Sequence, residues 1–186
     1  ATRRLLPVCF AILAAAFTLT VGPSGLICVA ALLAASRPVV HNLRVTAARV
    51  GALPVVAALL AAGLVVLVAV FADQPLSSVP PMMHAHDVAG PSLPWFDEYL
   101  RYQYLLQDTV DGSPTRRFGV FILVTALVVV TAVLLRRAGR LPGVAAGPTV
   151  RLLGATAGAM VVMMFTPTKW THHFGVFAGL TASVAA

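Results

Sequence analysis

Two long uncharged stretches restrict this chain to folds that lie in a membrane. No charged residue occurs in residues 5–36 or 52–72, and 59% of all residues are hydrophobic whereas only 10% are charged. An ordinary soluble domain does not need so much apolar surface. About 20 apolar residues suffice for one helix to cross the hydrocarbon core of a bilayer. We therefore predict an all-α polytopic membrane protein.

Six apolar segments are expected to form spans. As one helix, residues 5–36 would be about 48 Å long at about 1.5 Å per residue, so the Gly-Pro-Ser-Gly sequence at 22–25 is expected to divide this run. Gly154 and Gly158 have the spacing that lets another helix approach closely. The chain starts without Met and ends within an apolar run, as expected of a piece of a larger protein. We interpret 1–186 as a single partial transmembrane domain with spans at about 5–21, 25–40, 52–72, 118–135, 152–167 and, truncated, 174–186.

The distribution of charge indicates orientation in a membrane, not nucleic-acid binding. The formal net charge is +7, but all six acids lie within residues 73–117 and most bases lie at the ends of apolar segments. Nine of the thirteen bases fall in alternate loops on one side of the predicted topology, and the positive-inside rule places those loops in the cytoplasm. The 73–117 loop and the short 169–173 loop then share the outer face, and no nucleic-acid partner is expected.

The 73–117 loop is expected to carry one short amphipathic helix. Five prolines are expected to keep its first half extended, with His84 and His86 solvated there. In the second half, Arg101 can pair with a carboxylate in the first turn of the helix, Asp97 or Glu98. Such a helix would lie in the membrane interface or pack on the spans, and a sugar-stacking surface is the sharper alternative. Its aromatic stripe has helical spacing and consists of Trp95, Tyr99, Tyr102 and Leu106.

The polar sequence Thr-Pro-Thr-Lys-Trp-Thr-His-His-Phe-Gly at 166–175 contains the candidate functional residues. It interrupts two apolar segments, and ionisable groups near membrane depth are costly and by default mark functional sites. A membrane anchor would explain Lys169 and Trp170 but not His172 and His173. With the neighbouring threonine hydroxyls, that of Thr168 among them, these side chains offer positive charge and hydrogen bonds to a phosphate, and a flat apolar face to a sugar or lipid.

Metal binding and a catalytic base are not indicated by these residues. In an extended loop the adjacent side chains of His172 and His173 would point apart, and no H-x-x-x-H or H-E-x-x-H spacing occurs. Transfer of a sugar needs a carboxylate that takes the proton of the acceptor hydroxyl, and no acid of the 73–117 loop stands out for that role. The base is therefore expected to lie outside this chain.

Three segments carry a resemblance to a known family. They read Phe-Thr-Pro-Thr-Lys-Trp-Thr-His-His-Phe-Gly at 165–175, Glu-Tyr-Leu-Arg-Tyr-Gln-Tyr-Leu at 98–105, and Thr-Val-Asp-Gly-Ser at 109–113, the last followed by Arg116 and Arg117. They resemble the mycobacterial-type cell-wall arabinosyltransferases, the Emb family targeted by ethambutol. The resemblance implies a membrane domain of the GT-C glycosyltransferase fold, with about six of its helices in this chain.

The resemblance also implies an activity and a set of partners. Family members transfer arabinofuranose from decaprenyl-phosphate-arabinose to cell-wall arabinan at the outer, periplasmic face of the inner membrane. The loop matching Trp170 and His172 lines their active-site pocket, and we add Thr168, Lys169 and His173 as candidate substrate-binding residues. The family's catalytic aspartate lies in a loop that nothing in this chain resembles, so the chain alone is expected to be inactive. A homo- or hetero-dimer with a paralogue is implied, and no cofactor is required, although a divalent cation is compatible.

Two other functions remain open from the sequence. A transporter or flippase for a polyprenyl lipid or sugar would be favoured by broken helices such as that at 22–25, but no ionisable residue lies within an expected span. A purely structural membrane domain with an anchored outer loop is the third hypothesis. It predicts that changes at Trp170 and His172 alter insertion or stability and leave turnover intact.

Overall fold

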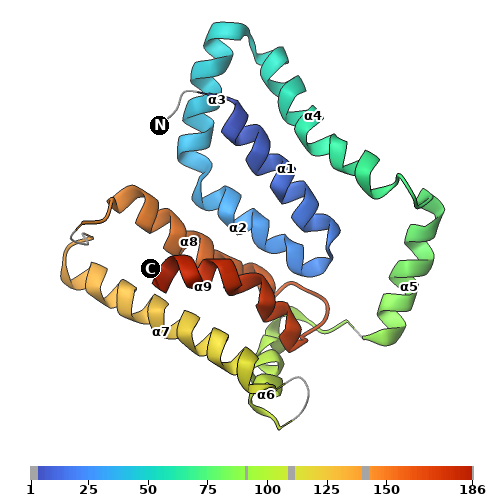
Figure 1. The fold of residues 1–186 in the computed structure, drawn as a ribbon, viewed down its shortest axis with the longest axis vertical. Helices are drawn as coiled ribbons and strands as arrows, with labels where there is room; N and C mark the ends of the chain where they lie inside the picture. The colour runs from blue at the N-terminus through green and yellow to red at the C-terminus, as the bar shows by residue number, and fades with distance from the viewer. Residues whose placement is uncertain (1–3, 91, 109–111, 140–142, 186) are drawn as a thin grey trace.

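The computed structural model describes residues 4–90, 92–108, 112–139 and 143–185, and the regular elements in these ranges are all helical (Figure 1). The α-helices are α1 Leu6–Thr20, α2 Ile27–Ala34, α3 Ser36–Val50, α4 Ala52–Val70, α5 Val79–Ala89, α6 Tyr99–Leu106, α7 Pro114–Arg136, α8 Ala146–Met163 and α9 Ala178–Ala185. Short 3₁₀ helices occupy Pro23–Leu26, Leu76–Ser78, Trp95–Glu98 and Thr171–Phe177. The prediction of an all-α polytopic membrane protein is confirmed.

Fewer spans are found than the six expected. Among the described residues, three helices are long and apolar enough to cross a membrane, namely α4, α7 and α8. The segment 23–34 and α3 would add a fourth as one bent pair, while α1 is a shorter apolar helix. The last expected span, at 174–186, consists here of part of a 3₁₀ helix and the eight residues of α9. Helix breaks near Gly22, Ala35 and Phe177 shorten the elements, so six full spans are not confirmed.

The second expected span, at 25–40, is wrong as a single helix. The helix α2 ends at Ala34, and α3 continues at an angle of 65° to it. The apolar run ends at the same point, because Arg37, Arg44 and Arg49 follow within α3. The helix α3 contains no buried residue. It is therefore a basic helix on the surface, and only its first residues lie within the expected span.

The glycines of α8 allow it to pack closely on α2. A Cβ atom on Gly158 would lie 3.1 Å from the Cβ of Ala30, and one on Gly154 would lie 3.8 Å from the Cβ of Ala34. The close approach predicted from the glycine spacing is therefore confirmed. The core beside this contact lies where α2, α6, α7, α8 and the 3₁₀ helix Thr171–Phe177 meet, and its buried residues are Ala30, Leu105, Val120, Leu123, Ala159, Met163, Phe174 and Phe177.

The segment between α4 and α7 differs from the prediction in its first half. Residues 79–89 were expected to be extended, but they form α5, which carries Pro80 and Pro81 in its first turn. Proline is tolerated there, because the first N–H groups of a helix have no partner within the helix. His84 and His86 thus lie on a helix, and His86 is half-buried.

The helix expected after Pro94 is confirmed, although its buried face is not the aromatic one. A 3₁₀ turn, Trp95–Glu98, leads into α6, yet Trp95 and Tyr99 are 54% and 60% exposed. The buried side chains are those of Glu98, Arg101 and Leu105. The charged pair of this helix therefore faces the protein.

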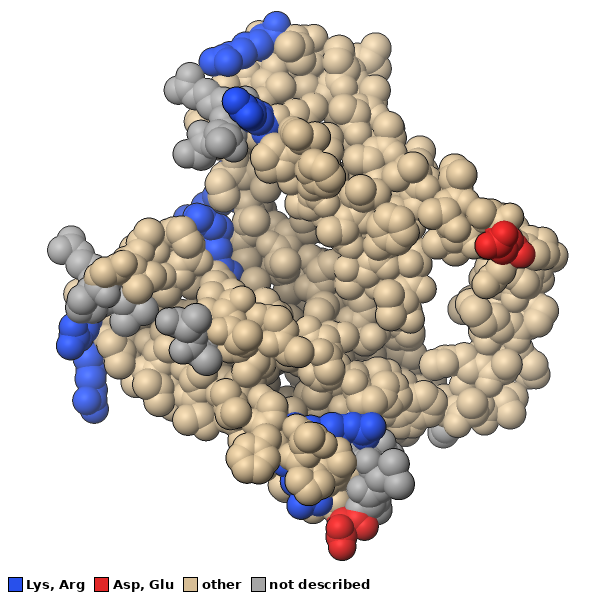
Figure 2. Space-filling model, viewed as in Figure 1, with Lys and Arg blue, Asp and Glu red and all other residues tan. Residues whose placement is uncertain are grey.

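Basic and acidic side chains lie in different parts of the molecule. In the view of Figure 2, basic side chains appear around the end of α3 near the N-terminus and at the end of α7 near α8, and a further group lies by α6. The acidic side chains visible in this view lie at the α4–α5 connection and beside α6. The 166–173 segment is at the α6 end, away from the bend between α2 and α3 (Figure 1).

Candidate functional site

The 166–173 segment follows the end of α8 and includes the first residues of the 3₁₀ helix Thr171–Phe177. The helix α8 ends at Met163, four residues before the expected end of that span. Pro167 favours such an end, because proline has no N–H and the residue before it avoids helical geometry. The amide of Leu93 donates a hydrogen bond to the carbonyl oxygen of Pro167 at 2.7 Å. The segment that follows α5 therefore holds the loop from one side.

The side chain of Arg101 holds the loop from the other side. Its guanidinium group is fully buried and forms a salt bridge with Glu98, with 2.8 Å between Nε and Oε1. An arginine has five N–H groups in a fixed plane. Here these groups face acceptors on Glu98, at the end of α8 and in the 166–173 segment. Besides Glu98, the acceptors are Trp170 O at 2.7 Å, His173 Nδ1 at 2.8 Å, Thr166 Oγ1 at 2.7 Å, Thr168 O at 3.1 Å and Met163 O at 3.5 Å.

Lys169 supports the loop from inside and is not displayed on its surface. It is 1% exposed, and its ammonium group donates to the carbonyl oxygens of Met164 at 2.6 Å and Thr166 at 2.9 Å. The carboxylate of Glu98 lies 3.5 Å from its Nζ. Burial lowers the pKa of Lys169, and the Glu98 carboxylate opposes that shift. Lys169 is thus committed to the fold of the loop, and its contact with a substrate stays a prediction.

His172 and His173 lie closer together than an extended loop would allow. They occupy a 3₁₀ helix, and their ring centroids are 4.5 Å apart. The expectation that they point apart is therefore wrong. His173 is buried while His172 is exposed. Among the described residues, no group of three or more His, Cys, Asp or Glu side chains is placed to hold a metal.

His173 is held as the neutral imidazole. Burial is the main cause that lowers its pKa from 6.5 to about 4, followed by the charge of Arg101. Because arginine can only donate, the Nδ1 atom of His173 accepts the bond from Arg101, and the ring carries its proton on Nε2. The neutral ring can therefore donate one hydrogen bond from Nε2.

Acidification is expected to weaken the fold around His173. The folded state binds fewer protons than the unfolded state between pH 6.5 and about 4, so the free energy of unfolding should fall as the pH is lowered through this range, by at most about 3 kcal/mol. Thermal unfolding of the full-length protein in lipid nanodiscs at pH 7 and pH 4.5 measures the loss. His173→Gln should reduce the difference between the two pH values, and an equal difference in both proteins would contradict the assignment.

Trp170 is surrounded by imidazole rings. Its ring centroid lies 5.3 Å from that of the exposed His172, 6.2 Å from that of His173 and 6.1 Å from that of His86 on α5. Gly90, at the end of α5, packs so closely that a Cβ atom there would lie 2.4 Å from Cζ2 of Trp170. His86 was expected to be solvated, and this is wrong, because α5 places it against Trp170.

Two arginines at the start of α7 tie the neighbouring elements together. Nη1 of Arg116 donates to the hydroxyl oxygen of Thr171 at 2.9 Å. Arg117 donates to the carbonyl oxygens of Leu105 at 2.8 Å and Gln107 at 2.6 Å, which satisfies carbonyl groups that the end of α6 leaves without helical partners. Arg116 therefore joins α7 to the 166–173 segment, and Arg117 joins it to α6.

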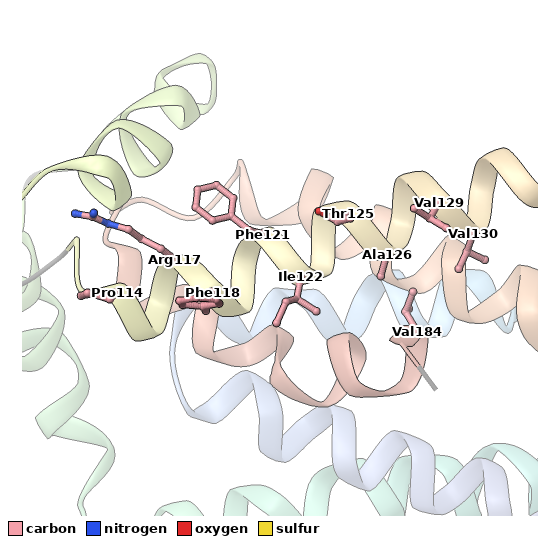
Figure 3. A pocket seen from close by; sticks show the side chains of 10 residues that line it. All are labelled: Pro114, Arg117, Phe118, Phe121, Ile122, Thr125, Ala126, Val129, Val130 and Val184. Atoms are coloured by element: carbon pink, nitrogen blue, oxygen red, sulfur yellow. The ribbon is translucent and has the colours of Figure 1, made fainter.

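Two grooves run along α7 from these arginines. One has a volume of about 470 Å³ and lies between α7 and α9, with Arg116 and Thr115 at one end and Phe174 and Phe177 in its lining. The other has a volume of about 800 Å³. Figure 3 shows its apolar side chains along one face of α7, with Pro114 and Arg117 at one end and Val184 of α9 beside Ala126. Both grooves are mainly apolar and begin near the charged groups of α7.

The sequence prediction identified the loop but missed the groups that shape it. It named Trp170 and His172, which the structure places side by side, and Thr168, Lys169 and His173, which are buried. It did not include Arg101 or His86. The only local signal for Arg101 was its spacing from Glu98, whereas its other bonds reach residues 62 to 72 positions away.

Comparison with known proteins gives one consistent result. Residues 1–186 match the family model described as mycobacterial cell wall arabinan synthesis protein. The chain is 53% identical over 184 residues to probable arabinosyltransferase B of Mycobacterium leprae, and 52% identical over 184 residues to that of Mycobacterium tuberculosis. It is 48% identical over 180 residues to probable arabinosyltransferase C of Mycobacterium leprae. These matches cover 97–98% of the chain but 17% of the length of each relative.

Proposed function

The chain belongs to the family of mycobacterial cell wall arabinan synthesis proteins, and we propose that the whole protein transfers arabinofuranose from decaprenyl-phosphate-arabinose to cell-wall arabinan. The names of its relatives, arabinosyltransferases B and C, support a glycosyltransferase. One structural observation carries the proposal for this part of the protein. The half-buried indole of Trp170 is held between imidazoles by the buried cluster of Arg101, Glu98 and Lys169.

In this proposal the 166–173 segment binds sugar and does not perform the proton transfer. The indole of Trp170 offers an apolar face to the sugar ring, and His172 beside it hydrogen-bonds a sugar hydroxyl or the donor phosphate. Glu98 is a poor candidate for the base, because its carboxylate is buried in the salt bridge with Arg101 and close to Lys169. The catalytic base is proposed to lie elsewhere in the full-length protein.

The grooves along α7 are suited to the lipid part of the donor. The groove of about 470 Å³ starts at Arg116, which is bonded to Thr171 of the loop. A polyprenyl chain in this groove would place its phosphate near a guanidinium group and its sugar near Trp170. No divalent cation is required for this arrangement, and one remains compatible with it.

The orientation and assembly of the protein follow from the same proposal. The basic ends of α3 and α7 would lie on the cytoplasmic side of the inner membrane, and the 166–173 segment on the periplasmic side. A dimer with a second copy or with a paralogue is proposed from the family resemblance.

The transporter hypothesis has less support. Transporter sites use broken helices near the middle of the membrane. Here the 65° bend follows Ala34, next to Arg37, whereas the Trp170 loop lies near the opposite end of α2 (Figure 1). Movement of the lipid-linked sugar by reconstituted protein without cleavage of the donor would favour the transporter.

Replacing both Trp170 and His172 by alanine in the full-length protein is expected to reduce arabinosyl transfer by about a hundredfold or more, because one stacking contact and one hydrogen bond to a charged or polar group are lost together. The assay follows radiolabelled arabinose from the lipid donor into an arabinan acceptor.

The matched control replaces Phe96 and His84 by alanine, since both side chains are exposed and lie outside the loop. That variant should retain transfer within about threefold. Unchanged transfer in the Trp170 and His172 double variant would refute the proposed site. Loss of insertion or stability in that variant, with turnover per folded molecule intact, would support the structural hypothesis.

A further inference from the structure

Two buried polar atoms beside Trp170 have no hydrogen-bond partner. They are Oγ1 of Thr168 and Nε2 of His86, and they are the two such side-chain atoms found among the described residues. Thr168 is 1% exposed. A buried polar atom without a partner costs about 1–3 kcal/mol, so native structures rarely leave one without a bridging water or a ligand.

The end of α5 packs both residues close to the same indole. Gly90 follows His86 by one helical turn, and its amide donates to the carbonyl oxygen of His86 at 3.0 Å. A Cβ atom on Gly90 would lie 3.0 Å from Cη2 of Trp170 and 3.1 Å from Cγ2 of Thr168. His86 itself lies edge-on to the indole, with an angle of 63° between the ring planes. Trp170, Thr168 and α5 therefore form one contact.

Neither group is free to reach a partner elsewhere in the described structure. The carbonyl oxygens of Thr168 and Trp170 both accept bonds from the buried guanidinium of Arg101. The backbone that carries the Thr168 hydroxyl is thereby fixed. His86 is fixed by its place on α5 and by its contact with Trp170.

The chemistry of these groups suits one hydroxyl group of a sugar. A threonine hydroxyl both donates and accepts, and an imidazole nitrogen does one or the other according to its tautomer. An indole next to them covers the apolar face of a sugar ring. We propose that Thr168 and His86 form a subsite that hydrogen-bonds a hydroxyl of a furanose ring bound against Trp170. This inference rests on the proposed transferase function.

The furanose in question can come from either of two molecules. It is the arabinose of the lipid-linked donor or the terminal arabinose of the acceptor, since both present the same ring hydroxyls. Separate titration of the donor and the acceptor distinguishes them, because only the substrate that binds the subsite should show a raised KM.

The test uses the full-length protein and two nearly isosteric changes. Thr168→Val removes the hydroxyl and keeps the shape, and His86→Phe keeps an aromatic edge against Trp170 while it removes the nitrogen. Each is expected to raise the KM for one substrate about tenfold, as for one lost hydrogen bond, with a smaller change in kcat. Thr168→Ser, which retains the hydroxyl, should restore the KM to within about threefold of the wild-type value.

Deoxy analogues of the affected substrate give a readout that a purely structural role would not change. The analogue that lacks the recognised hydroxyl should bind the wild-type protein about tenfold more weakly, and Thr168→Val should discriminate it from the parent sugar far less. If every variant discriminates the analogues as the wild type does, a bridging water satisfies the two atoms and the subsite is refuted. Retained KM values in these variants, combined with loss of transfer in the Trp170 and His172 double variant, would refute the subsite alone. Full transfer in that double variant would instead refute the proposed function.

Discussion

Replacing Arg101 by lysine is expected to abolish the arabinosyl transfer that we propose for the full-length protein, without preventing its insertion into the membrane. The planar guanidinium group serves Glu98 and acceptors on Thr166, Trp170 and His173 at the same time. A lysine carries its donors on a single nitrogen and cannot reproduce that fork. Several buried acceptors would lose their partner, and each buried acceptor left without one costs about 1–3 kcal/mol. The loss of stability should be greatest in the 166–173 segment, because Arg101 forms hydrogen bonds to this segment at several points.

Hydrogen exchange separates this local effect from general unfolding. In the Arg101→Lys protein, amides of residues 166–173 should exchange faster, while those of α4 and the middle of α8 keep their protection. Arg44→Lys is the control, since Arg44 is exposed on α3 and should change neither transfer nor exchange. If Arg101→Lys retained transfer within about threefold and kept the loop protected, the guanidinium cluster would not be what positions Trp170.

The elements that follow from local composition could be predicted from the sequence. The α4 span was expected at 52–72 and lies at Ala52–Val70, because an uninterrupted apolar run ends at polar or helix-breaking residues on both sides. The close packing of α8 followed from the spacing of Gly154 and Gly158. The loop at 166–175 was visible as a polar interruption, and its position at the end of α8 follows from Pro167.

The features that depend on distant contacts could not be predicted in this way. The aromatic stripe of α6 was expected to lie in the membrane interface, pack on the spans or stack on a sugar, and nothing in it predicted that Arg101 is buried, because the acceptors of Arg101 come from the loop after α8. Similarly, His86 was expected to be solvated in a segment that prolines keep extended. Those prolines begin a helix, and its end carries His86 to Trp170. Local pattern thus predicted α4 and the helix after Pro94 but missed α5, whereas the site depends on which distant polar groups form hydrogen bonds with one another.

Replacing Gly90 by alanine is expected to reduce transfer by about a hundredfold while the protein stays folded. The backbone at Gly90 has φ −150° and ψ 102°, an extended conformation that alanine adopts without strain. The cost is therefore steric, since the added Cβ would lie 2.4 Å from Cζ2 and 3.0 Å from Cη2 of Trp170. The indole must move by roughly 1 Å to restore an ordinary contact, and a displacement of that size in a site can cost about a hundredfold in rate.

A double-mutant cycle tests whether the indole is the group that moves. Trp170→Phe removes the atoms that the new Cβ would strike, so Gly90→Ala should cost little further transfer when Trp170 is already phenylalanine. The two changes would then be strongly non-additive, as expected for residues in direct contact. Gly179→Ala provides the control, because nothing lies within 4 Å of a Cβ there. Additive losses in the cycle would mean that Gly90 acts through another part of the protein, and they would refute the inference that its contact with Trp170 positions the indole.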